Sequence, residues 1–243
     1  MAAAAEPVAG QLLELSEVDA GYGPFRAIFG VTLRMLPGSV LALLGSNGAG
    51  KTTIARVCSG LIKPTRGSVH FAGEDVTGCA PHEYARRGVV HAPEGRSVFA
   101  SLTVEENLQL TFQRSRAHRD VRAALDEAYQ LFPRLGDRHR QLAGTLSGGE
   151  QRMLSLARVL VERPRLLIAD ELSLGLAPIV VDEVYRTLAT IRETGTAVLI
   201  VEQHVHHALA VADEAIVLTK GEVAYAGPVS ELGDLQARLL GHS

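Results

Sequence analysis

A glycine-rich stretch early in the chain has the residue types and spacing that bind phosphate. It reads Gly45-Ser46-Asn47-Gly48-Ala49-Gly50-Lys51-Thr52 and fits the pattern G-x-x-x-x-G-K-[ST]. In this pattern, backbone N–H groups curl around the phosphates, the lysine reaches the terminal phosphates and the hydroxyl takes Mg²⁺. An apolar run before it (40–44) and a helical pattern after it (53–58) favour this interpretation over a chance glycine-rich turn. The stretch therefore predicts a site for a nucleotide with Mg²⁺.

A second stretch combines a helix start with two glycines and indicates another anion site. It reads Leu146-Ser147-Gly148-Gly149-Glu150-Gln151. Ser147 and Glu150 have the spacing of a capping box, and the glycines let a ligand approach the N–H groups at the helix start. Taken alone, a capping box marks only the beginning of a helix. Here the helix has apolar residues at helical spacing, stops at Pro164 and leads to a strand that ends in two acids, which favours a functional site.

The two acids are Asp170 and Glu171, which follow the apolar run 166–169. Open parallel sheets bind ligands at the carboxyl ends of their strands, and carboxylates beside a phosphate loop suit the handling of Mg²⁺ and of an attacking water. The alternative of solvated loop acids does not account for the apolar run before them. We therefore expect both acids to lie near the phosphate loop.

An α/β fold is needed to position these segments, and strand and helix patterns alternate along the chain. Strands are expected at residues 40–44, 166–169, 197–201 and 215–218, and helices at residues 179–192 and 205–212. Shorter strand patterns predict a small antiparallel sheet near the adenine, at residues 12–18, 31–35 and 67–71. A mainly helical insertion precedes the second stretch and contains a helix over residues 121–131 that ends at Phe132-Pro133.

Composition agrees with an intracellular enzyme and excludes several other classes. The chain has 243 residues, 47% of them hydrophobic, and no apolar run long enough to cross a bilayer. Residues 1–10 are interpreted as a flexible tail and not a signal peptide, which predicts a cytoplasmic protein. Lys plus Arg (24) nearly balance Asp plus Glu (27), so no nucleic-acid surface is indicated. Cys58 and Cys79 have neither disulfide nor metal spacing.

Together with five further motifs, the two stretches resemble the ATP-binding subunit of branched-chain amino acid ABC importers. The further motifs are Tyr22, Pro93-Glu94-Gly95-Arg96, Thr103-Val104-Glu105-Glu106-Asn107-Leu108, Ser173-Leu174-Gly175-Leu176-Ala177-Pro178 and Val201-Glu202-Gln203. The resemblance extends from about Leu12 to Leu240. It implies one ABC ATP-binding domain over residues 11–243, of the P-loop NTPase class. Such a domain has a RecA-like parallel-sheet core, a small antiparallel β subdomain and a helical subdomain inserted at about residues 92–162.

The resemblance also implies roles for individual residues in binding ATP and Mg²⁺. Tyr22 stacks on the adenine, and the phosphate loop from Gly45 to Thr52, with Thr53, binds the phosphates. Thr52, Glu94 and Asp170 are the expected Mg²⁺ ligands, Asp170 acting through water. Glu171 orients and deprotonates the attacking water, and it is grouped with Lys51 and Gln203 as catalytic.

Partners are implied in the same way. In the family each nucleotide is enclosed between the phosphate loop of one cassette and the signature, here residues 146–151, of a second cassette. The signature therefore acts in trans within a homodimer or heterodimer, and a heterodimer with a sister cassette is expected. Two membrane permeases, contacted by residues 93–107, and an extracytoplasmic substrate-binding protein complete the importer. The cassette is expected at the inner face of the cell membrane, attached only through the permeases.

Three positions depart from the usual cassette pattern. Glu94 replaces a glutamine, which still offers a Mg²⁺ ligand and is typical of this subfamily. Leu172 replaces a proline, which is expected to loosen the following turn slightly. Gln203 occupies the place of the switch histidine, and His204 follows it, so either residue is a candidate for that role. His204, His206 and His207 also suggest a metal site, but solvated helix histidines are the favoured interpretation.

Other functions remain open at this point. A non-transport ABC ATPase would show a second cassette, a long coiled-coil insertion or a strongly basic surface, and a small-molecule kinase would not need the signature. Within transporters, the substrate is determined by the binding protein and the permeases. Urea, short amides and other amino acids are therefore alternatives to branched-chain amino acids.

Overall fold

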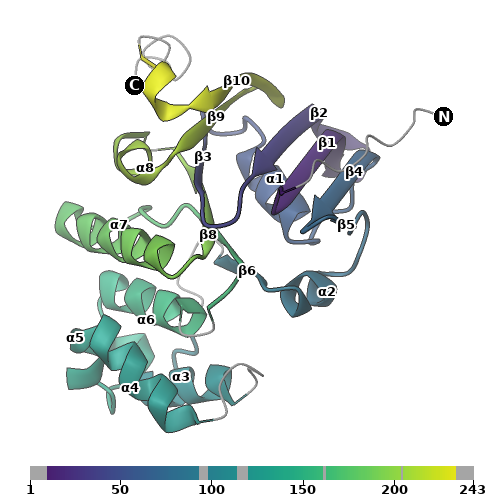
Figure 1. Ribbon diagram of the computed structural model, residues 1–243. Coiled ribbons are helices and arrows are strands. Elements are labelled where there is room, and N and C mark those ends of the chain that lie inside the picture. The colour runs from purple at the N-terminus through teal and green to yellow at the C-terminus, as the bar shows by residue number, and fades with distance from the viewer. Residues whose placement is uncertain (1–9, 93–97, 114–119, 161–162, 204, 234–243) are drawn as a thin grey trace.

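The computed structural model describes residues 10–92, 98–113, 120–160, 163–203 and 205–233 (Figure 1). Within these residues, six strands form the larger sheet in the spatial order β10-β9-β3-β8-β7-β6. Neighbouring strands from β9 to β6 are parallel, whereas β10 pairs antiparallel with β9 at the edge. Their bounds are Val40–Gly45 (β3), Val89–Ala92 (β6), Leu166–Asp170 (β7), Ala197–Glu202 (β8), Glu214–Thr219 (β9) and Glu222–Pro228 (β10).

Both faces of the central parallel strands are covered. Every residue of β3, β7 and β8 is buried, as continuous apolar runs in such sheets require. Alternate residues of β3 enter two separate cores: Ala42 and Leu44 pack on the side of α7, while Leu41 and Leu43 pack on the side of α1. All four predicted core strands are confirmed.

A second, antiparallel sheet lies on the far side of α1 (Lys51–Cys58) and has the order β2-β1-β4-β5. Its strands are Leu13–Tyr22 (β1), Phe25–Met35 (β2), Arg66–Phe71 (β4) and Glu74–Asp75 (β5). The three predicted strands of this sheet are confirmed, but β2 begins six residues before the expected residue 31. Gly30 has a φ of 57° and interrupts the alternation of side chains, which hid the first half of the strand. The sheet provides one wall beside the phosphate loop.

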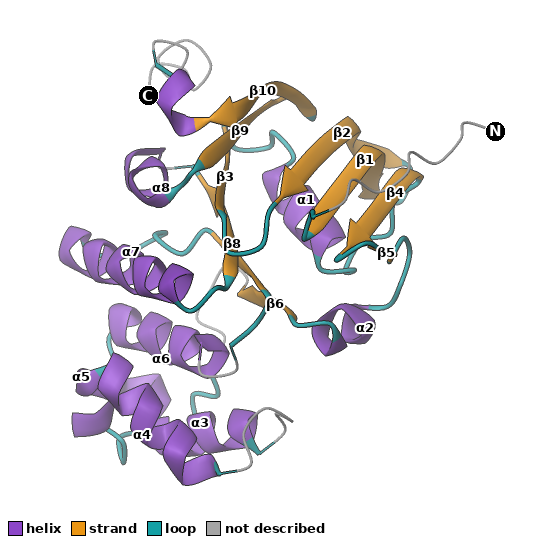
Figure 2. Ribbon diagram, viewed as in Figure 1, coloured by secondary structure: helices purple, strands orange, loops and turns teal. Residues whose placement is uncertain are grey.

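One group of helices gathers beside β6 and β7, away from the antiparallel sheet (Figure 2). They are Val104–Phe112 (α3), Val121–Leu131 (α4), Pro133–Asp137 (α5) and Gly148–Leu160 (α6), with a 3-10 turn at Ala143–Thr145 (η1). The predicted helix over 121–131 is confirmed, and Pro133 begins the next one. Both ends of the predicted insertion at 92–162 touch residues outside the described ones, as do residues 1–9, so these boundaries stay predictions.

Helices α7 (Pro178–Glu193) and α8 (Val205–Val211) follow β7 and β8 and agree with the predicted helices. The short helix α2 (Pro81–Arg86), the strand β6, the edge strand β10 and the 3-10 turn Val229–Glu231 (η2) were not predicted. None of the helices in the described ranges combines the length and apolarity that a membrane crossing requires.

Candidate active site

An open hollow of about 540 Å³ lies at the carboxyl end of the large sheet. Its lining comes from the ends of β1, β7 and β8, from β2 and from the phosphate loop with the start of α1. The lining residues are Tyr22, Ala27, Asn47, Gly48, Gly50, Lys51, Thr52, Thr53, Glu171, Leu174 and Gln203. We call this hollow the cleft. It brings together most of the residues predicted from sequence to bind ATP and all three of those predicted to act in catalysis, Lys51, Glu171 and Gln203.

Lys51 is held inside the phosphate loop by the loop's own backbone. Its side chain is 4% exposed, and its ammonium donates hydrogen bonds to the carbonyls of Gly45 (2.8 Å) and Ser46 (3.1 Å). Gly50 precedes it with a φ of 105°, and a Cβ there would lie 2.7 Å from Cγ2 of Ile28. Only glycine therefore lets the loop pass this close to β2 and start α1 at Lys51.

The two predicted acids lie at the end of β7. Asp170 is buried, and Glu171 takes a left-handed conformation with a φ of 48°, which is uncommon for a residue with a side chain. The Glu171 backbone is fixed on both sides, since its N–H donates to the Val201 carbonyl (2.9 Å) and its carbonyl accepts from Nη2 of Arg152 (3.0 Å). Leu172 then enters the main core. These contacts hold Glu171 where its side chain lines the cleft.

Burial and the neighbouring charges shift the pKa of Lys51 in opposite directions. Burial lowers the pKa of Lys51 below its ordinary value, and the charges of Glu171, Asp170 and Glu202 oppose that shift. Lys51 is thus a buried cation with three carboxylates near it, of which Glu171 lines the cleft. An anionic phosphate with a divalent cation fits this charge pattern, because the phosphate pairs with the lysine and the metal with the acids.

Tyr22, at the end of β1, also lines the cleft and is 45% exposed. Its hydroxyl accepts a hydrogen bond from Nη1 of Arg56 (3.0 Å), and the Arg56 guanidinium carbon lies 5.7 Å from the centre of the ring. One face of the ring is thereby engaged by a cation from α1, which sequence analysis did not foresee. Tyr22 therefore lines the cleft in contact with Arg56, and its role at the adenine stays a prediction.

Two of the predicted residues cannot be placed. Glu94 lies outside the described residues, and so does His204. Gln203 is exposed, follows β8 directly and lines the cleft. Its switch role, and the comparison with His204, stay predictions.

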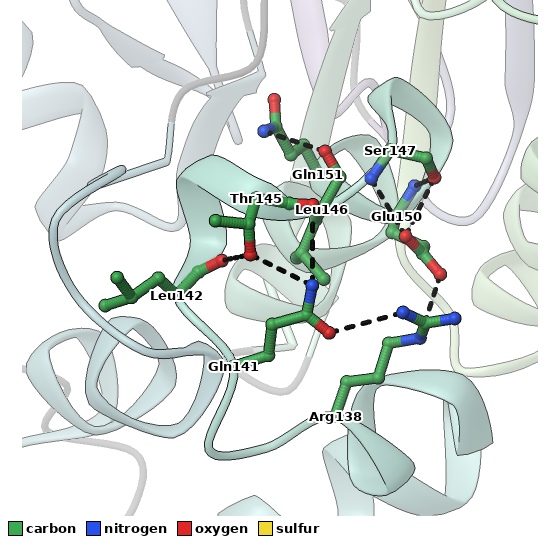
Figure 3. A network of polar contacts seen from close by, with 8 residues as sticks. All are labelled: Arg138, Gln141, Leu142, Thr145, Leu146, Ser147, Glu150 and Gln151. Atoms are coloured by element: carbon green, nitrogen blue, oxygen red, sulfur yellow. Dashed lines mark hydrogen bonds and ion pairs between the residues drawn. The ribbon is translucent and has the colours of Figure 1, made fainter.

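The predicted capping box at Ser147 and Glu150 is present (Figure 3). Oε2 of Glu150 accepts from the N–H and from the hydroxyl of Ser147, both at 2.9 Å, and the Glu150 N–H donates back to the Ser147 hydroxyl (3.3 Å). Oε1 of Glu150 pairs with Nε of Arg138 at 3.1 Å. Burial of Glu150 acts to raise its pKa, but the Ser147 hydrogen bonds and the charges of Arg138 and Arg134 outweigh it and lower the pKa. The helix start is therefore well ordered by local contacts.

The signature contacts neighbouring segments but does not line the cleft of its own chain. Gln151 donates to the carbonyls of Ala143 (2.9 Å) and Leu146 (3.2 Å), which fixes the turn before α6. A Cβ on Gly149 would lie 2.6 Å from Cγ1 of Val180, so glycine lets α6 pack against the first turn of α7. Ser147 itself remains exposed at the surface.

One sequence interpretation needs correction. His206 is exposed, but His207 is only partly exposed: its ring stacks on Tyr185 with centroids 5.4 Å apart, and its Nε2 lies 3.4 Å from Oδ1 of Asp182. The description of all three histidines as solvated is therefore wrong for His207. The carboxylate partner comes from α7, more than twenty residues away in sequence, so spacing on the helix gave no sign of it.

Comparisons with known proteins show the family to which the chain belongs. A family model described as "ABC transporter" matches residues 28–173, more than half of the chain. The chain belongs to the ABC transporter family. It is an ATP-binding cassette of the ATP-hydrolysing kind, as the sequence predicted. Cassettes of this family bind nucleotide and operate with a second cassette and membrane components.

Several relatives share nearly the full length. The chain is 39% identical to the high-affinity branched-chain amino acid transport ATP-binding protein BraG of Pseudomonas aeruginosa, over 87% of this chain and 91% of that protein. It is 34% identical to the probable branched-chain amino acid transport ATP-binding protein LivF of Archaeoglobus fulgidus, over 91% of this chain and 94% of that protein. The crystal structure of the ADP conformation of MJ1267, an ATP-binding cassette of an ABC transporter, has a TM-score of 0.82 at 23% identity and covers 95% of this chain and 97% of its own. This likeness confirms the predicted cassette fold.

Proposed function

We propose that this cassette hydrolyses ATP to drive the import of branched-chain amino acids. The observation that carries the proposal is the cleft, which Lys51, Glu171 and Gln203 from three segments line together with Tyr22. The substrate class rests on the relatives named as branched-chain amino acid transport proteins, the first of which is 39% identical to this chain. Urea, short amides and other amino acids are the alternative substrates.

The binding roles follow from the geometry. Tyr22 offers its ring to the adenine, and the phosphate loop with the first turn of α1 lines the cleft, where its backbone N–H groups would bind the phosphates. On ATP binding, Lys51 exchanges the carbonyls of Gly45 and Ser46 for oxygens of the terminal phosphates. The macrodipole of α1 adds to the positive potential there.

The residues present also fit Mg²⁺. Oδ1 of Asp170 is buried without a hydrogen-bond partner in the described part of the chain, and Thr52, which carries a hydroxyl, lines the cleft. Hard oxygen donors of this kind suit Mg²⁺, which keeps several of its waters. We propose that Thr52 and Asp170 hold the ion, Asp170 through water, with Glu94 as a third ligand. When bound, Mg²⁺ neutralises charge on the phosphate oxygens.

Hydrolysis then depends on two side chains at strand ends. Glu171 accepts a proton from the water that attacks the terminal phosphorus, and its fixed backbone keeps the carboxylate aimed into the cleft. The Gln203 amide donates a hydrogen bond to the γ-phosphate but cannot carry the proton that a histidine could. Gln203 therefore senses the γ-phosphate without changing charge.

The signature supports action in trans. Within residues 146–151, Ser147 is exposed at a capped helix start that does not line the cleft of the same chain. We propose that it closes on the nucleotide of a second cassette, in a dimer that ATP stabilises and hydrolysis releases. Two permeases and an extracytoplasmic binding protein complete the importer, which places the cassette in the cytoplasm at the inner face of the membrane, with no nucleic acid involved.

Uptake by the assembled importer tests this proposal. The cassette, its partner cassette, both permeases and the binding protein are reconstituted in vesicles with ATP and Mg²⁺, and uptake of labelled leucine, urea and acetamide is compared. We expect ATP-dependent leucine uptake that is lost in the Lys51→Ala importer. Uptake of urea or acetamide with none of leucine would overturn the substrate class, and uptake that is indifferent to Lys51 would overturn the proposed ATP site.

A further inference from the structure

Glu202, the last residue of β8, is a buried acid to which the proposed mechanism gives no role. Its side chain is 2% exposed, and both of its oxygens accept hydrogen bonds from one residue. The Ser173 N–H donates to Oε1 and the Ser173 hydroxyl donates to Oε2, each at 3.0 Å. We call this paired contact the Ser173–Glu202 clamp. Hydrogen bonds to a charged group are the stronger kind, and a bidentate pair also fixes orientation.

The clamp joins the two loops that carry the proposed hydrolytic residues. Ser173 comes two residues after Glu171, and Glu202 immediately precedes Gln203. The loops leave neighbouring parallel strands, since Asp170 of β7 is in register with Val201 of β8. The backbone ladder ends at the bond from the Glu171 N–H to the Val201 carbonyl, and the clamp extends the connection beyond it through a side chain.

Holding two loops together with a buried carboxylate costs free energy, because the charge must be removed from water. Desolvation costs several kcal/mol per buried ion, and replacing such a group with apolar side chains is often neutral or stabilising. The Glu202 charge also reaches its surroundings: it opposes the lowering of the Lys51 pKa that burial causes, and after burial it is the next cause of the raised pKa of Tyr185 on α7. The charge of this acid is therefore felt both by Lys51 and by Tyr185 on α7.

We propose that Glu202 is a positioning residue for hydrolysis, whose carboxylate fixes Ser173 and so holds Glu171 and Gln203 in a set arrangement about the terminal phosphate. Leu174, which follows Ser173 directly, lines the cleft and donates its N–H to the Glu171 carbonyl (3.4 Å). The inference rests on the proposed function and adds a residue that acts through others and does not touch the nucleotide.

Two conservative variants and their combination test the clamp. Ser173→Ala removes the hydroxyl donor, and Glu202→Gln keeps the shape of the side chain but loses its charge. In the assembled importer each variant should lower kcat about tenfold and leave KM for ATP within about twofold, because the binding residues are intact. The double variant should lose no more than the worse single one, since both changes break one contact. Ser173→Thr, which keeps the hydroxyl, should retain more activity than Ser173→Ala.

Thr196→Val is the matched control. The Thr196 hydroxyl is buried at the opposite end of β8 and donates to the Pro164 carbonyl (2.8 Å), so its loss should lower Tm and leave kcat unchanged. If Ser173→Ala and Glu202→Gln also change only Tm, or if their effects on kcat multiply in the double variant, the positioning role is wrong. The Lys51→Ala variant separates a failure of the clamp from a failure of the proposed function. If Lys51→Ala loses turnover while the clamp variants keep theirs, the positioning role of the clamp is refuted and the ATP site is not. If Lys51→Ala keeps normal turnover, the ATP site itself is refuted.

Discussion

Replacement of Lys51 gives the sharpest test of the phosphate loop, because the structure defines what is lost. Its ammonium has two carbonyl partners at 2.8 and 3.1 Å and is almost fully buried. If both of these hydrogen bonds pass to phosphate oxygens in the transition state, each is worth about 1.5–3 kcal/mol. Lys51→Ala should then raise the barrier by about 3–6 kcal/mol, which corresponds to a loss of roughly 10²–10⁴ in kcat/KM.

The assay is phosphate release by the assembled importer, with two further variants beside Lys51→Ala. Lys51→Met keeps most of the apolar stem and should lose as much activity as the alanine variant, since the charge is what matters. Lys63→Ala removes an exposed lysine just beyond α1 and should behave like the unmodified protein. The reasoning is refuted if Lys51→Met keeps activity within about threefold of the unmodified protein, or if the loss in Lys51→Ala is matched by a collapse of Tm.

Three other predictions follow from the same contacts. Ser147→Arg should stop hydrolysis at the partner's phosphate loop and spare nucleotide binding at its own, measured with one variant cassette per dimer; equal loss at both sites would indicate misfolding instead. Gln203→Ala should lower turnover by more than His204→Ala, because the Gln203 side chain lines the cleft; the reverse ranking would assign the switch role to His204. Burial raises the pKa of Cys58 to about 12, so a thiol reagent at pH 8 should modify the partly exposed Cys79 and reach Cys58 only after unfolding; equal labelling of both in the native protein would contradict this.

The parts of the fold that sequence predicted are those with a strong local pattern. The helix α4 has apolar residues at regular helical spacing, and the buried strands β3, β7 and β8 are continuous apolar runs. The edge strand β10 was missed because only alternate residues are partly buried and it contains Gly227 and Pro228, which weaken strand signals. The four-residue strand β6 was too short to recognise without its neighbour β7.

The site divides in the same way. The phosphate loop and Glu171 were recognisable because each follows directly on a buried strand, and parallel strands deliver their carboxyl ends to one edge of a sheet. The contact between Arg56 and Tyr22 joins segments 34 residues apart, and the Ser173–Glu202 clamp joins segments 29 residues apart. No local spacing encodes such pairs. The one available signal was that Glu202, like Asp170, is a charged residue at the end of an apolar strand.

The most direct test of the account is the oligomeric state of the Glu171→Gln cassette with ATP, Mg²⁺ and its partner cassette. The amide keeps the shape of the side chain but cannot take the proton, so hydrolysis should slow by about 10²–10⁴ while nucleotide still binds. Size-exclusion chromatography with light scattering should then show a stable two-cassette complex that contains ATP and that dissociates when the ATP is washed out. Cassettes that carry ATP and remain monomeric would contradict the claim that a second cassette's signature completes the site.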